Sequence, residues 1–405
     1  MIKKYVILTI LTVGFLVQSC TETDQVKTPF KTVLKGKEFV AANNKFAFDI
    51  YKNIAENETK ENYMISPVSL SLALGMAYNG AANNTKSAFE NTLNYASFLP
   101  EEINTINQEI ITNLSDNSVG SLFEIANSIW IKNSFPVKDD FININKKYYN
   151  AEVAKLDFAD ANSVNIINNW VADKTYQKIP KIINSISNND VLFLINAIYF
   201  KSDWKYTFKE EDTKELPFYG ENTTKNVETM YLNADLDFYE NEDLLAIKLP
   251  YKNDKYAMTI LLPKEGKNTQ DISNLLNTTN WENWNTNFSK KTIQLEMPKF
   301  TFSYEKTLNK PLKDLGLENA FTTSADFSNI SNLPIAISYV LQKTFIEVNE
   351  KGTEAAAVTS VGFVNLSLSP NQNKVALNKP FLFAITEKET NSICFMGKIG
   401  MPNDK

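Results

Sequence analysis

The feature that most constrains this 405-residue chain is a long series of apolar runs that follow helical patterns near the start. The runs are rich in β-branched and aromatic residues and are bounded by turns, which is typical of strands. The helical patterns do not alternate with them, so we expect an α+β protein with a large antiparallel or mixed sheet. The runs are FEIANSIWIK, VLFLINAIYF, LLAIKLPY, YAMTILLP, TIQLEMPKFTF, AISYVLQKTFIEVNE, VALNKPFLFAIT and SICFMGKIGMP.

Three segments predict helices. Apolar residues between Phe39 and Ile54 fall near one helical face. In SPVSLSLALGMAYNG, Ser66 is a good N-cap and Pro67 suits the first helical position. A third helix is expected from 163 to 177. Because no repeat or break in composition divides the chain, one large domain is the better prediction.

The absence of two residue types limits the chemistry. The chain has no His and no Arg, so it has no Ser-His-Asp triad, no His-ligated metal site and no arginine clamp for phosphate. Its net charge of −6 gives no electrostatic support for binding nucleic acid. We therefore expect a protein that is not an enzyme, with no cofactor and no metal.

The N-terminus has the pattern of a secretory signal. Lys3 and Lys4 precede an apolar run that is too short for a membrane span, and VQSC, ending at Cys20, resembles a bacterial lipobox. We expect a signal peptide over 1–19, lipid attachment at Cys20, and a tether over 20–37. The membrane would then be contacted only through the lipid, at the outer membrane or cell surface. The alternative is a plain signal peptide and a secreted protein.

One late stretch, EKGTEAAAVTSVGFVNLSLSP from Glu350 to Pro370, fits no single structure. Its first half is rich in helix formers, and its second half is β-branched and roughly alternating. A segment that is acceptable in a loop, a helix or a strand indicates a structural switch.

Five motifs in order resemble the serpin family of serine-protease inhibitors, over about residues 38–402. The family's hinge is matched by EVNEKGTEAAAVT, and LINAIYFKSDWKYTF matches its Asn-Ala-x-Tyr-Phe-Lys-x-x-Trp segment. The others are SPVSLSLALGMAYNGAANNT, MPKF and NKPFLFAI followed by FMG.

The resemblance implies a serpin domain over 38–405, monomeric, with a large central sheet, additional sheets and about eight to nine helices. An exposed reactive-centre loop over about 352–374 would be attacked by a protease and would then enter the sheet as a new strand. Counting from Thr353, every second residue would enter the core. The first four are Thr353, Ala355, Ala357 and Thr359, which are small and uncharged, and this favours insertion. Gly352 would be the pivot. The predicted hinge comprises Glu350, Gly352, Thr353, Glu354, Ala355, Ala356, Ala357 and Thr359.

The attacked bond follows from the usual length of the loop in the family. Counting about sixteen residues beyond Glu350 gives Leu366–Ser367. Counting back from NKPF gives a bond near Ser369 instead, so Leu368 and Ser369 stay as alternatives. Leu366 suits an apolar pocket, which predicts chymotrypsin-, elastase- or subtilisin-like targets, with cysteine proteases as a further class.

The resemblance also implies contacts that hold the sheet closed. Glu350 would pair with Lys299 at the top, beside Trp204. Four polar residues would hydrogen-bond across the middle: Ser66, Ser69, Asn196 and Gln342. Gln342 stands where the family commonly has His.

Two functions remain open at this point. The first is a suicide inhibitor of secreted serine proteases, and the second is a non-inhibitory serpin that binds or carries a ligand. Non-inhibitory members often have bulky or charged residues at the inward hinge positions, whereas this chain has Thr and Ala there.

Overall fold

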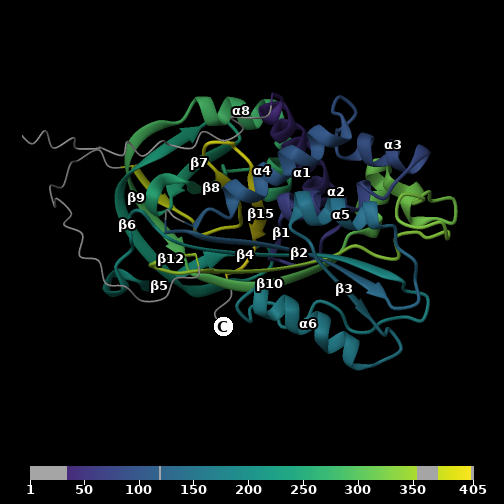
Figure 1. Cartoon of the computed structure of the whole chain (residues 1–405). Coiled ribbons are helices and arrows are strands. Elements are labelled where there is room, and N and C mark those ends of the chain that lie inside the picture. Colours follow the sequence, from purple (N-terminus) through teal and green to yellow (C-terminus); the bar gives the residue numbers. More distant parts are fainter. Residues whose placement is uncertain (1–33, 118–119, 354–372, 403–405) are drawn as a thin grey trace, which may run out of the picture.

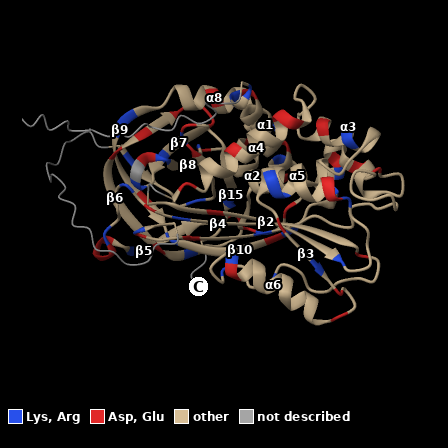
Figure 2. Ribbon diagram, in the orientation of Figure 1, with Lys and Arg blue, Asp and Glu red and all other residues tan. Residues whose placement is uncertain are grey.

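A computed structural model describes residues 34–117, 120–353 and 373–402 of the chain. Within these residues it contains two β-sheets and nine α-helices, which confirms the α+β prediction (Figure 1). Most helices lie on one side of the six-stranded sheet, and α6 covers the opposite face. In Figure 2, lysine and acidic residues are interspersed along the ribbon.

The six-stranded sheet includes the predicted hinge. All its neighbouring strands are antiparallel except β2 and β3. In spatial order the strands are β10 (Phe300–Thr307), β11 (Leu341–Val348), β12 (Gly352–Thr353), β4 (Leu192–Asp203), β2 (Leu122–Lys132) and β3 (Glu152–Leu156).

The nine-stranded sheet packs on the other side of the main core. Its strands run β1 (Tyr63–Ile65), β15 (Ile393–Ile399), β14 (Phe381–Glu387), β8 (Tyr256–Pro263), β7 (Leu244–Pro250), β6 (Thr224–Glu240), β9 (Ser289–Pro298) and β13 (Asn373–Ala376), and β5 (Lys214–Tyr219) pairs with β6. Residues from both sheets and from α1 and α2 form one apolar core.

The helices come mostly from the first half of the chain. They are α1 (Gly36–Asn57), α2 (Pro67–Tyr78), α3 (Asn83–Thr92), α4 (Pro100–Leu114), α5 (Asp139–Tyr149), α6 (Asn162–Lys174), α7 (Thr269–Leu275), α8 (Thr278–Thr286) and α9 (Asn309–Leu312). Helix α2 begins as predicted, with Pro67 first and the Ser66 hydroxyl accepting a hydrogen bond from the Ser69 amide.

Strand β4 is buried on both faces, which explains its uninterrupted apolar sequence. On one face Phe193, Ile195 and Ala197 join a small cluster under α6. On the other face Ile198 and Phe200 join the main core. No simple alternation could therefore identify which side faces α2.

Two predicted strands have different boundaries in the structure. TIQLEMPKFTF is divided at Lys299, and its two halves, β9 and β10, belong to different sheets. The run that starts at Ala336 becomes a strand only at Leu341. Both differences arise from tertiary contacts, which a local pattern of apolar residues does not encode.

Candidate functional site

The first two residues of the predicted loop are not exposed but form the short strand β12. Gly352 pairs with Asp203, and Thr353 pairs with Ser202 on β4 and Val348 on β11. The predicted loop is therefore too long by at least these two residues at its start. At its end, β13 already begins at Asn373.

Thr353 points into the core, as its predicted inward position requires. Its side chain is 3 % exposed, and its hydroxyl lies 2.6 Å from the Tyr251 hydroxyl. Burial raises the pKa of Tyr251 well above its usual range, although the hydrogen bond with Thr353 opposes this. A hydrogen bond between two neutral hydroxyls, those of Thr353 and Tyr251, therefore holds the start of the hinge in the sheet.

Gly352 lies closer to β4 than any other residue type could. A Cβ atom at this position would be 2.1 Å from the Ser202 carbonyl oxygen. The neighbouring backbone could accommodate it only by moving, because that oxygen belongs to the main chain. Glycine is thus required here by close approach between strands.

Glu350 is the acidic group at the top of the sheet, and it is buried. Its carboxylate lies 3.4 Å from the Lys299 ammonium and accepts a hydrogen bond from the Thr213 hydroxyl. Lys299 also pairs with Glu228 at 3.2 Å. Burial disfavours the charged lysine, but the two carboxylates outweigh it and raise the pKa of Lys299.

Trp204 attaches β4 to the turn that precedes β12. Its indole N–H donates to the Asn349 carbonyl at 3.0 Å, and its amide donates to the Lys351 carbonyl at 2.7 Å. Its ring stacks on Tyr251, with centroids 4.5 Å apart. The contacts of Trp204 and Lys299 therefore meet around the hinge, as the resemblance implies.

The four polar residues of the middle form one tie to β11 and one to β4, which meet at the start of α2 where the Ser69 amide donates to the Ser66 hydroxyl. The Gln342 side-chain amide accepts from the Ser66 amide and donates to the Ser66 carbonyl, each at 2.9 Å. The Ser69 hydroxyl donates to Asn196, whose amide donates to Asn127 at 2.7 Å. The first tie joins α2 to β11 and the second joins α2 to β4, so no hydrogen bond among these four residues links β4 to β11.

Below β12, the facing edges of β4 and β11 have no ladder between them in the described part of the chain. Both strands run antiparallel to β12, so they are parallel to each other. We call the space between these two edges the seam. A strand that continued β12 would run antiparallel to both edges.

Several predicted site residues lie outside the described residues. They are Cys20, Glu354, Ala355, Ala356, Ala357, Thr359, Leu366 and Ser367. Sequence reasoning missed Tyr251, Thr213, Glu228 and Asn127, which contact the hinge or the polar ties. They come from distant segments, and no local pattern distinguishes them from ordinary polar residues.

The described ranges contain neither a candidate metal cluster nor a candidate membrane span. No group of three or more Cys, Asp or Glu side chains is arranged to hold a metal ion there. None of the helices described has both the length and the apolar character to cross a membrane.

Comparison with known proteins agrees with this arrangement. The family profile described as "Serpin (serine protease inhibitor)" matches residues 41–402. An uncharacterized serpin-like protein of Methanosarcina mazei is 34% identical over 385 residues, covering 92% of this chain and 89% of that protein. The chain belongs to the serpin family.

Two solved structures illustrate the range of that family. Tengpin, a thermophilic serpin in its native state, has a TM-score of 0.83 and 34% identity, covering 90% of this chain and 94% of tengpin. Human thyroxine-binding globulin in complex with thyroxine has a TM-score of 0.83 and 27% identity, covering 92% of this chain and all of that one. The same fold thus occurs in a family described as serine protease inhibitors and in a protein that binds thyroxine.

Proposed function

We propose that this protein inhibits exported serine proteases by covalent trapping. The observation that carries the proposal is the position of the hinge: Thr353, small and uncharged, is buried between β4 and β11 at the top of the seam. After cleavage, the rest of the loop would enter the seam as a strand and carry the attached protease with it.

The register of β12 predicts which residues of β4 such a strand would pair with. Continued antiparallel to β4 from the pair of Thr353 with Ser202, it would place Ala355, Ala357 and Thr359 opposite Phe200, Ile198 and Asn196. These inward residues carry no charge, so burying them costs little desolvation free energy. Some ten residues bonded at both edges, at about 0.5–1.5 kcal/mol per hydrogen bond, would release more than ~10 kcal/mol. That is comparable to the stability of a whole domain.

Leu366 is the proposed specificity residue, with the bond to Ser367 as the cleaved one. The protein should form gel-stable covalent complexes with chymotrypsin- or elastase-type proteases and none with trypsin, whose pocket carries a buried Asp. Leu366→Lys should shift the complexes toward trypsin. Mass spectrometry of the released peptide then identifies the bond: a start at Ser367 supports Leu366, and a start at Ser369 or Pro370 moves it to Leu368 or Ser369.

The second candidate is a non-inhibitory binding protein, and the similarity to thyroxine-binding globulin favours it. The same experiment separates the two functions. Complete cleavage of the loop by every protease, with no covalent complex, would reject inhibition and favour the non-inhibitory binding protein. Complexes with trypsin but not with chymotrypsin would keep inhibition and reject Leu366.

We further propose export as a lipoprotein, with a tether that runs from Cys20 to the start of α1 at Gly36, two residues shorter than the predicted 20–37, and leaves the domain at the cell surface. The support is the signal pattern before Cys20. Cys20→Ala should abolish labelling by a radioactive fatty acid and release the protein from the membrane fraction. Unchanged labelling of this variant would reject lipidation at Cys20.

A further inference from the structure

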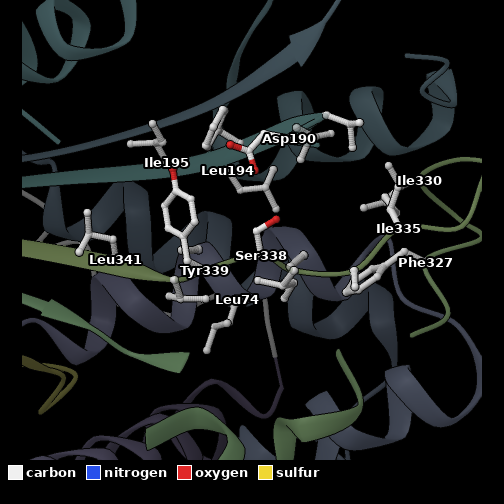
Figure 3. Close-up of a pocket in the computed structure, with 18 of the residues that line it drawn as sticks. Leu74, Asp190, Leu194, Ile195, Phe327, Ile330, Ile335, Ser338, Tyr339 and Leu341 are labelled. Atoms are coloured by element: carbon white, nitrogen blue, oxygen red, sulfur yellow. The ribbon is translucent and has the colours of Figure 1, made fainter. Parts of the chain in front are cut away.

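The lower end of the seam widens into a cavity of about 710 Å³ (Figure 3). Strand β4 supplies one wall from Leu192 to Asn196, and α2 supplies another through Ala73 and Leu74. The segment from Phe327 to Gln342, which ends in β11, closes a third side.

This space is too large to be an ordinary packing defect. Protein interiors are close-packed, and voids larger than a water molecule are few. An apolar cavity of about 150 Å³ already binds benzene. The cavity here has the volume of typical sites for small organic ligands.

The lining is mainly apolar but includes several polar side chains. Leu194, Ile195, Phe327 and Ile335 are among the apolar residues drawn in Figure 3. Asp190 and Ser338 also line the cavity, together with Tyr339 (Figure 3).

The charge of the lining is one-sided. Asp190 is 8 % exposed and is the one charged residue among the described residues that line the cavity, which include no lysine. One carboxylate oxygen of Asp190 accepts a hydrogen bond from the Ser187 amide at 2.8 Å. A buried carboxylate gains from a hydrogen-bond donor and repels a second anion.

Solvent reaches the cavity on one side. Leu333 and Tyr339 line it and are also exposed on the surface of the protein, at 50 % and 36 %. This side of the lining is where a ligand would enter from the surface.

We infer that this cavity binds an apolar small molecule whose one polar end donates a hydrogen bond, such as an alcohol or a protonated amine, and discriminates against a carboxylate. The apolar body would lie against Leu194, Ile335 and their neighbours, and Asp190 would accept the hydrogen bond. The inference goes beyond protease inhibition and does not depend on it, since binding concerns the intact protein alone.

The test uses an uncharged fluorescent probe and three competitors with one chain length. Nile red should bind the full-length protein with a blue-shifted, saturable emission. Decanol and decylamine, below their aggregation limits, should displace it at concentrations at least tenfold lower than decanoate. Displacement by all three at equal concentration, or by decanoate best, would reject the assigned polarity.

Two variants test the location. Asp190→Asn keeps the shape and an oxygen that can accept from Ser187, so it should remove most of the discrimination against decanoate. Ala73→Phe should fill the cavity and weaken Nile red binding at least tenfold. Ala41→Phe, the same change at an exposed position of α1, is the matched control and should leave binding unchanged.

Circular dichroism verifies that each variant is folded before binding is compared. If folded Ala73→Phe binds Nile red as the parent does, the probe lies elsewhere and the inference is wrong. If Asp190→Asn keeps the full discrimination, the polar end is misassigned. Neither result bears on inhibition, because no protease is present.

Discussion

Thr353 is the residue whose side chain has to be tolerated both in the core and in solvent if the loop is to insert. It is small enough for the core and carries one hydroxyl, which Tyr251 satisfies. The polar group therefore costs little while it is buried, and water can satisfy it equally well outside.

Replacing Thr353 with Arg should prevent the hinge from seating, because an unpaired buried charge costs several kcal/mol. With a protease that the parent traps, this variant should be cleaved and released, so the protein becomes a substrate. Densitometry of a denaturing gel measures the ratio of complex to cleaved chain. Thr353→Ser keeps the hydroxyl and should trap as the parent does; unchanged trapping by Thr353→Arg would contradict the inward role.

A second residue-scale feature is Glu58, which joins the end of α1 to β10. Its carboxylate accepts hydrogen bonds from Tyr304 and from the Lys306 ammonium, the latter at 2.8 Å. Burial favours the neutral acid, but these bonds outweigh it and lower the pKa of Glu58 from 4.5 to about 2. A depressed pKa means that this contribution to stability is complete above pH 4.5 and is lost as the pH falls toward 2.

Glu58→Gln should therefore lower the free energy of unfolding at pH 7 by about 1–2 kcal/mol, after allowance for screening by solvent. At pH 2 the variant and the parent should unfold at nearly the same urea concentration. Urea titrations followed by tryptophan fluorescence at both pH values provide the check. An equal loss of stability at both pH values would show that packing, and not charge, explains the effect.

At the scale of elements, β12 is the feature that sequence patterns place least well. EVNEKGTEAAAVT identifies the hinge through the family resemblance, and the motifs with Trp204 and Lys299 identify its neighbours. The two-residue strand itself depends on Tyr251, Ser202 and Val348, which approach from three separate segments. Such contacts are tertiary, so the sequence of the hinge alone does not predict them.

Gly352→Ala should displace β12 from β4, because its Cβ would overlap the Ser202 carbonyl. Amide hydrogen exchange at Thr353 and Trp204 should become at least tenfold faster, since the contacts of both depend on that approach. Gly266→Ala is the control: Gly266 has a φ of +77° in a remote turn with open space around it. It should cost some stability but leave exchange at the hinge unchanged, and slow exchange in Gly352→Ala would refute the close-approach argument.

For the whole molecule, the order of helices and strands and the five ordered motifs predict the fold class and the family. They do not predict that β4 and β11 are left without a ladder between them in the described ranges, because their sequences suit a paired core strand equally well. The cavity is hidden for the same reason. Leu194 and Ile335 read as core residues, and only the three-dimensional arrangement leaves space between them.

In the ranges that the structure describes, the facing edges of β4 and β11 have no ladder between them, so backbone groups there are free of strand pairing that a further segment of the chain could supply. We therefore expect the intact protein to persist because its conversion is slow, so that its stability is measured by a lifetime. Calorimetry of the intact protein should give an apparent melting temperature that rises with scan rate. After the loop is cleaved by a protease that is not trapped, the midpoint should rise by at least ~10 °C, as expected when several kcal/mol are added to a large domain. A midpoint independent of scan rate and unchanged by cleavage would mean that the intact protein unfolds at equilibrium and gains no stability from a strand in the seam.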